Sequence, residues 1–328
     1  MRILNLVWSL TLLAGVLAMP TTVFASSQQY QTCMLSEIDS AADSLTVGAL
    51  RAICTSADDT QISIVTERLE QDRKNTLEPF TILSHKPNYL LLANYNSNGY
   101  QDSFDDNFTE TNDRHLDNTE AHFQLSLKVP LEANLFNRNI DLYGAYTVRS
   151  FWQVYNTEES SPFRETNHEP EFWLQAYPKW SLFGLKNSIV MLGIAHQSNG
   201  RSEPISRSWN RVYADFIFEK QNFVLSVKPW FRISEDSDED DNPDITDFLG
   251  HYELRALYKS RSGHQFSLMS RNNIESGFDR GAIEAGWSFP LGRWPYLRGY
   301  VQYFRGYGES LLDYNEKANS IGIGIMLK

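Results

Sequence analysis

A histidine, a serine and an asparagine in the second half of the chain could together cleave an ester. His196 and Ser198 stand two residues apart, and Asn210 follows after a short polar segment. A serine hydroxyl becomes a nucleophile when a histidine takes its proton, and an asparagine can hold that histidine in the required tautomer. We therefore consider an acyl-transfer triad in which Ser198 attacks, His196 is the general base and Asn210 orients His196.

The residues around these three alternate between apolar and polar side chains, as expected for β-strands. His196 and Ser198 share the parity of Val190, Leu192 and Ile194. Asn210 has the parity of a second apolar series, which consists of Val212, Ala214, Phe216 and Phe218. Because a wide membrane barrel keeps apolar side chains outside, the three candidates are predicted on its lipid-facing wall. A hydrogen-bonding His–Ser pair without a chemical role is an alternative that these residues alone leave open.

The strands that must carry these residues are predicted from a period of two that begins near Asn88. About twelve segments of about ten residues have this period. They lie near 88–96, 121–129, 140–154, 171–177, 188–198, 208–219, 223–233, 251–259, 264–271, 281–289, 296–305 and 321–327.

The connections between these segments differ in length. Long polar connections, such as 97–117, 156–167 and 234–247, alternate with short ones, such as 259–263 and 290–295. An even number of strands with long loops at one end predicts an all-β fold, a twelve-stranded antiparallel transmembrane β-barrel. A soluble β-sandwich has the same period but does not need so many long strands with one apolar face.

The composition fits a membrane barrel and argues against nucleic acid as a partner. Of the residues, 13% are aromatic, including 16 Tyr and 8 Trp, which gather at the membrane interfaces of such barrels. Beyond the N-terminal segment, no run of about 18 apolar residues occurs, so no transmembrane helix is predicted. The net charge of -12 repels nucleic acid phosphates.

The N-terminal residues have the pattern of a secretory signal peptide. Arg2 precedes an apolar run from Ile3 to Met19, and small residues precede a cleavage point after Ala25. We therefore predict a signal peptide over 1–25 and a mature chain that works outside the cytoplasm.

A short extension is predicted between the signal peptide and the barrel. Residues 26–79 are rich in acidic residues and form a periplasmic extension that is helical or disordered, and residues 80–328 form the barrel domain. Cys33 and Cys54 lie in the extension. In an oxidising compartment they could form one disulfide that closes a loop of about 20 residues.

Several sequence blocks closely resemble the bacterial outer-membrane phospholipase A family. They are residues 158–167 (EESSPFRETN), 196–202 (HQSNGRS), 206–211 (SRSWNR), 228–230 (KPW), 241–245 (DNPDI) and 306–311 (GYGESL). The resemblance runs from about Phe80 to the C-terminus. It implies a barrel in the bacterial outer membrane that hydrolyses sn-1 and sn-2 acyl esters of phospholipids and lysophospholipids, requires calcium and is active as a homodimer.

The same resemblance implies roles for individual residues. It gives Ser198, His196 and Asn210 the roles of nucleophile, base and orienting partner. It also implies that the backbone N–H of Gly200 helps to form an oxyanion hole.

The resemblance further implies a set of calcium ligands. The backbone carbonyl of Arg201 and the side chain of Ser206 would bind the ion together with Ser160 of the second subunit. Asp241 matches a ligand of a second calcium position.

Two other functions fit parts of the sequence. The polar inward faces are compatible with a passive channel, and the acidic loops with an adhesion or binding barrel. A barrel with many inward charged and tyrosine side chains is, however, more often filled by its own hydrogen-bonded core.

Overall fold

A computed structural model describes residues 35–36, 38, 46–48, 50, 64–76, 82–100, 116–178, 180–236, 238, 240–292 and 294–327. The predicted signal peptide, most of the predicted extension, Cys33 and Cys54 lie outside the described residues. The signal peptide and the disulfide therefore stay predictions. The chain divides into two compact units, Met1–Gln61 and Ile62–Lys328.

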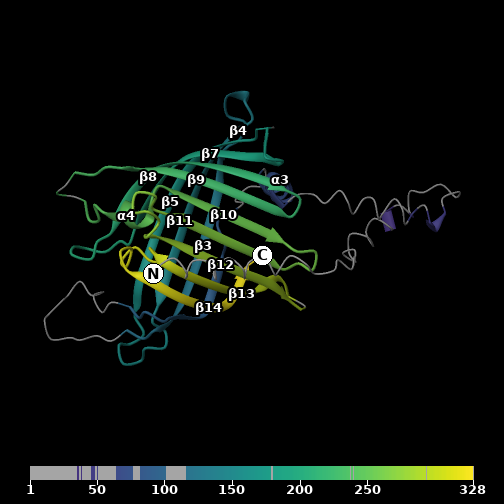
Figure 1. The fold of residues 1–328 in the computed structure, drawn as a ribbon. Helices are drawn as coiled ribbons and strands as arrows, with labels where there is room; N and C mark the ends of the chain where they lie inside the picture. The colour runs from purple at the N-terminus through teal and green to yellow at the C-terminus, as the bar shows by residue number, and fades with distance from the viewer. Residues whose placement is uncertain are drawn as a thin grey trace, which may run out of the picture. The chain divides into compact units, whose positions relative to one another are not determined.

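Long antiparallel strands form a closed barrel in the second unit (Figure 1). The described part of the chain has one fourteen-stranded sheet, in which β1 (Leu83–Ser84) and β6 (Ser181–Leu182) have two residues each. The other twelve strands are β2 (Tyr89–Asn96), β3 (Thr119–Glu132), β4 (Ile140–Trp152), β5 (Phe163–Ala176), β7 (Leu185–Ser198), β8 (Ser208–Lys220), β9 (Phe223–Ile233), β10 (Tyr252–Lys259), β11 (Gln265–Asn272), β12 (Gly281–Leu291), β13 (Trp294–Tyr307) and β14 (Lys317–Leu327). Neighbours in sequence pair with one another, and the pairing of β14 with β2 joins the ends of this series. The prediction of a twelve-stranded antiparallel barrel is therefore confirmed.

Short helices accompany the strands. They are α3 (Ile64–Thr76), the 3-10 helix η1 (Leu135–Asn137) and α4 (Ile245–Leu249). Among the described residues, none of the helices is both long and apolar enough to cross a membrane.

The two ends of the barrel differ in their connections. Segments 153–162, 199–207, 234–251, 273–280 and 308–316 join strands at what we call the long-loop end. Tighter connections, such as 221–222 and 260–264, join strands at the short-turn end.

Many of the side chains that face the barrel interior are charged, and these form ion pairs. Glu171 is fully buried and accepts from the Nζ atoms of Lys86 and Lys228 at 2.5 and 3.5 Å. Glu169 accepts from Lys86 at 2.6 Å and from Arg211 at 2.7 Å. Because a buried charge is tolerated only when it is paired and hydrogen-bonded, these ion pairs stabilise the charged groups of the interior.

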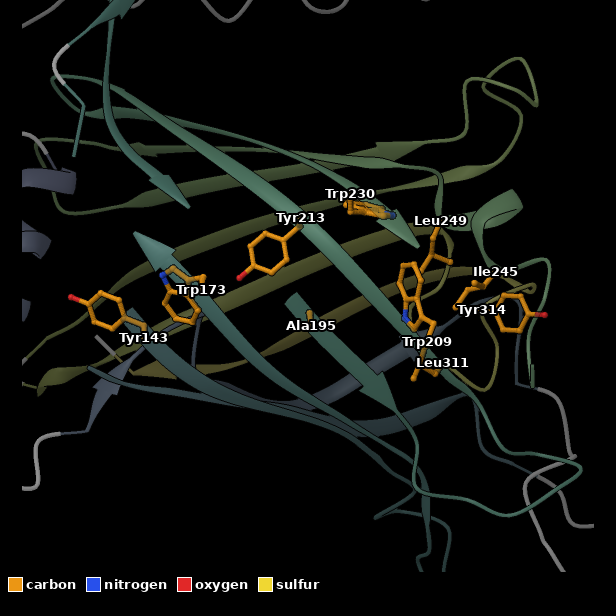
Figure 2. Close-up of a cluster of buried hydrophobic side chains, with 10 residues drawn as sticks. All are labelled: Tyr143, Trp173, Ala195, Trp209, Tyr213, Trp230, Ile245, Leu249, Leu311 and Tyr314. Atoms are coloured by element: carbon orange, nitrogen blue, oxygen red, sulfur yellow. The ribbon is translucent and has the colours of Figure 1, made fainter. Parts of the chain in front are cut away.

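An aromatic cluster extends through the interior toward the long-loop end (Figure 2). Its members are Tyr143, Trp173, Ala195, Trp209, Tyr213, Trp230, Ile245, Leu249, Leu311 and Tyr314. Helix α4 contributes Ile245 and Leu249, and the indole N–H of Trp230 donates to the carbonyl of Gly250 at 3.0 Å. The loop that follows β9 is thereby anchored on the barrel, beside the start of β8, where the Ser208 N–H donates to Oδ1 of Asn242 at 2.9 Å.

Helix α3 packs at the short-turn end of the barrel. Lys128 of β3 donates to Asp72 of α3 at 2.7 Å, and both side chains are nearly buried. Thr66 donates to Glu219 of β8 at 3.3 Å. This helix lies within the sequence range predicted as the extension, yet it belongs to the same compact unit as the barrel.

Strand β5 begins at Phe163, eight residues before the segment predicted from the sequence. Its first half lacks apolar alternation because the outward Thr166 and His168 are polar, like the inward Glu165 and Asn167. Glu165 and Asn167 are buried and accept from backbone N–H groups of the loop that follows β13. The predicted loop 156–167 therefore ends earlier than expected.

Candidate active site

His196 and Asn210 lie directly opposite each other on β7 and β8. Nδ1 of His196 and Oδ1 of Asn210 are 2.9 Å apart. In the tautomer that donates Nδ1–H to the amide oxygen, Nε2 keeps a lone pair that can accept a proton. This is the arrangement that an orienting partner and a general base require.

Both side chains leave the barrel wall outward, as the alternation of side chains predicted. On β7, Leu192 and Ile194 share the face of His196 and are 57% and 54% exposed. On β8, Val212 shares the face of Asn210 and is also exposed. The pair therefore borders the apolar surface that meets lipid.

The Asn210 amide also contacts Glu235, a residue that the sequence analysis did not single out. Nδ2 of Asn210 donates to Oε1 of Glu235 at 2.7 Å. A carboxylate accepts only from the amide nitrogen, so this contact directs the amide oxygen toward His196. No sequence signal separated Glu235 from the other acidic residues of its loop, because the contact depends on how that loop folds back over β8.

Ser198 is the last residue of β7 and shares the outward parity of His196. Its register partners are Ser208 on β8 and His168 on β5. His168 also faces outward, and its Nδ1 lies 2.5 Å from the Tyr146 hydroxyl. His168 was not among the predicted site residues, although its outward parity, shared with Phe172 and Leu174, was a signal in the sequence.

The loop after Ser198 is held by the buried side chain of Asn199. Its amide nitrogen donates to the carbonyl of Ile205 at 2.8 Å, and its oxygen accepts from the N–H groups of Arg201 and Arg207 at 3.2 and 3.0 Å. Gly200 has a φ of 65°, a left-handed conformation that residues with a Cβ rarely adopt. These hydrogen bonds therefore fix the backbone conformation directly after Ser198.

Oxygen ligands suited to a hard cation gather beside this loop. Ser206 donates to Oδ2 of Asp241 at 2.6 Å. Glu203 is close to Asp241, and their hydrogen bond and mutual repulsion raise the pKa of Glu203. Carboxylate and hydroxyl oxygens are the ligands that Ca²⁺ prefers, so the residues present fit this ion. Glu203 was not among the predicted calcium ligands. The only sequence feature that could have indicated it is its position as an acidic residue in the loop 199–207, next to the predicted ligands.

The remaining predicted ligands are Ser160 and the Arg201 carbonyl. Ser160 is exposed on the connection 153–162, where it could reach another molecule. Among the described residues, no group of three or more His, Cys, Asp or Glu side chains is arranged to hold a metal ion. A calcium site here would therefore depend on hydroxyl and backbone oxygens as well as on carboxylates.

Comparisons with known proteins agree on one family. A family model described as phospholipase A1 matches residues 65–327. Phospholipase A1 of Salmonella typhimurium is 39% identical over 249 residues, which cover 76% of this chain and 82% of that protein. Phospholipase A1 of Escherichia coli K12 is 38% identical over 249 residues, which again cover 76% of this chain and 82% of that protein.

Solved structures with the same fold were also found. An outer membrane phospholipase dimer of Salmonella typhi with bound calcium has a TM-score of 0.70 at 37% identity, covering 78% of this chain and 96% of that one. Outer membrane phospholipase A of Escherichia coli has a TM-score of 0.69 at 37% identity, covering 76% and 99%.

Proposed function

The chain belongs to the phospholipase A1 family of bacterial outer-membrane β-barrel enzymes, and from this premise we propose that Ser198, His196 and Asn210 cleave the acyl esters of membrane phospholipids. The observation that carries the proposal is the 2.9 Å contact between His196 Nδ1 and Asn210 Oδ1 on the outer wall. A phospholipid can diffuse to that wall without leaving the bilayer. The site therefore meets its substrate in the membrane.

The triad acts in two steps. His196 Nε2 takes the hydroxyl proton of Ser198 while the serine oxygen attacks the ester carbonyl carbon. The tetrahedral intermediate collapses to an acyl-serine, and the leaving alcohol takes the proton from His196. A water, deprotonated by His196, then attacks the acyl carbonyl carbon. The bond to the Ser198 oxygen breaks, the serine takes the proton back from His196, and the fatty acid leaves. Asn210 holds the imidazole in one tautomer throughout, and Glu235 holds Asn210.

The negative oxygen of each tetrahedral intermediate needs donors. The N–H of Gly200 is one, and it follows Ser198 on a loop whose conformation Asn199 maintains. Because the donor is already oriented before the charge develops, no reorganisation is needed during the reaction.

Calcium and a second subunit complete the proposed site. The Arg201 carbonyl, the Ser206 hydroxyl and Ser160 of the partner subunit would hold one ion, and Asp241 a second position, with Glu203 beside it. A bound ion would supply positive charge near the developing oxyanion. The oxygen cluster described above supports this assignment, as does the similarity to a dimer with bound calcium. Activity toward both acyl esters and toward lysophospholipids is part of the same proposal.

The test is fatty acid release from phosphatidylcholine by the purified, detergent-solubilised protein. We expect Ser198→Ala to lower the rate by at least about 10³-fold, since removing a nucleophile leaves only binding and oxyanion effects. Ser202→Ala, an exposed serine of the same region, is the matched control and should be near wild type. A calcium chelator should abolish activity, and added calcium should restore it. Undiminished activity of Ser198→Ala would refute the mechanism.

A further inference from the structure

A second histidine stands beside the proposed nucleophile on the outer wall. His168 of β5 is the register partner of Ser198 of β7. Directly opposite residues of an antiparallel pair have Cβ atoms about 5 Å apart, so the two side chains are neighbours. From Phe172 toward the end of β5, the face that His168 shares is apolar, with Phe172 51% and Leu174 39% exposed. The imidazole nitrogens of His168 need hydrogen-bond partners at this position.

One ring nitrogen has its partner within the protein. Nδ1 of His168 lies 2.5 Å from the hydroxyl of Tyr146, which projects from β4 on the same face. If the phenol donates its hydrogen to Nδ1, the hydrogen of the neutral ring stands on Nε2. Tyr146 thus orients His168 as Asn210 orients His196. The tautomers differ, because His168 carries its hydrogen on Nε2 and His196 carries it on Nδ1.

The other edge of the ring faces the residue that carries the proposed oxyanion donor. A methyl group built on Gly200 would lie 3.8 Å from Cδ2 and 3.9 Å from Nε2 of His168. The Nε2 edge therefore borders Gly200 and lies on the side of Ser198 away from Asn210. The ring edge of His168 and the backbone of Gly200 are thus neighbours on the same side of Ser198.

We propose that His168 is a further catalytic residue, whose Nε2–H donates a hydrogen bond to the carbonyl oxygen of the scissile ester, next to the N–H of Gly200. The inference rests on the proposed function. The two histidines then divide the work: His196 moves the proton, and His168 stabilises the negative oxygen. Tyr146 is a positioning residue that keeps the hydrogen on Nε2.

The experiment compares three variants on phosphatidylcholine in mixed micelles, with kcat and KM measured separately. His168→Phe keeps a ring but loses the donor, and kcat should fall about 10²-fold with little change in KM, the effect of removing one oxyanion donor. His168→Gln keeps an N–H donor and should recover most of kcat. Tyr146→Phe should give an intermediate loss, because the tautomer is no longer enforced. Leu174→Phe, on the same face, is the control and should stay near wild type.

Several outcomes would overturn the proposal. Wild-type kcat in His168→Phe would do so, as would equal losses in His168→Phe and His168→Gln, which would mean a packing role. A loss in His168→Phe that disappears in covalently cross-linked dimers would mean a subunit contact instead. Ser198→Ala, assayed in parallel, separates the two ideas. An active Ser198→Ala refutes the proposed function, whereas an inactive one beside a fully active His168→Phe refutes this inference alone.

Discussion

Asn210 lies between His196 and Glu235, and its contacts with these two side chains fix the orientation of its amide. Its oxygen faces His196 Nδ1 and its nitrogen donates to Glu235. In the reaction proposed here His196 becomes a cation, and a carboxylate one amide away stabilises that cation. Glu235 therefore acts on His196 through Asn210, in the way a buried aspartate acts directly on histidine in other triads.

Variants of this pair should separate orientation from charge. We expect Asn210→Ala to lower kcat about 100-fold, because the imidazole loses its tautomer and orientation. Glu235→Ala should cost a smaller factor of about 10, and Glu235→Gln less still, since its amide oxygen can accept the same hydrogen bond. Asp236→Ala, an exposed acid of the same loop, is the control. Equal losses in Glu235→Ala and Asp236→Ala would point to general loop charge instead.

A buried acid in the loop after β13 should make stability depend on pH. Glu309 accepts from the Ser320 hydroxyl at 2.5 Å, and burial raises its pKa from 4.5 to about 7. The folded state thus favours the neutral acid. This stabilisation is complete below pH 4.5, where the unfolded state is also protonated, and is lost as pH rises through 7.

Glu309→Gln tests this dependence. Between pH 4.5 and 7 the wild type should lose on the order of 3 kcal/mol of unfolding free energy that the variant keeps. Denaturant unfolding of detergent-solubilised protein at a series of pH values measures the difference. Parallel pH profiles of the two proteins would show that Glu309 is not responsible.

At the scale of elements, the register of the β7–β8 hairpin decides which way the side chains of the proposed triad face. Successive side chains of a strand point to opposite sides, so a shift of one residue would turn His196 and Ser198 into the interior. The register that pairs His196 with Asn210 also pairs Ile194 with Val212, and both of these are exposed. The outward position of the site is therefore tied to the burial pattern of the whole hairpin.

Helix α3 offers a comparison between a buried and an exposed ion pair. Asp72→Asn should lower the unfolding free energy by about 3 kcal/mol, because Lys128 is left as a nearly buried charge without its carboxylate partner. Glu67→Gln removes the exposed contact of Glu67 with Lys259 at 3.2 Å and should change stability by less than about 1 kcal/mol. Denaturant unfolding measures both. Similar effects of the two variants would contradict the docking of α3 through Asp72.

For the whole molecule, the filled interior and the family membership decide against the two alternative functions. Paired charges such as those of Glu171 and Lys86 occupy the interior of the described barrel. A passive channel would need this space for water and ions. The adhesion barrel had only the acidic loops in its favour, and part of one such loop, at Glu235 and Asp241, contacts the triad and the oxygen cluster.

The proposed dependence on a partner subunit can be tested by complementation. Ser160→Ala and Ser198→Ala should each be inactive alone. In a mixed dimer, the site with an intact Ser198 receives an intact Ser160 from the other subunit. An equal mixture, refolded together, should regain about a quarter of the wild-type sites, since half of the dimers are mixed and each has one working site. A mixture without activity would contradict a ligand supplied by the partner subunit.

The sequence by itself determined the barrel, its strand number and the outward parity of His196, Ser198 and Asn210. These features are local, because each strand's own sequence shows the alternation of apolar and polar residues. The prediction failed over the first half of β5, where Thr166 and His168 interrupt the apolar series. There, the strand is stabilised by contacts of Glu165 and Asn167 with a distant loop.

Only the tertiary structure decided which residues contact the proposed triad. His168 reaches Ser198 through the register of β5 and β7, and Glu235 reaches Asn210 because the loop after β9 folds back. Glu203 meets Asp241 in the same way, across two loops. Such contacts join residues that are far apart in the chain. They depend on strand order, register and loop conformation together, so they cannot be predicted from the local spacing of residues.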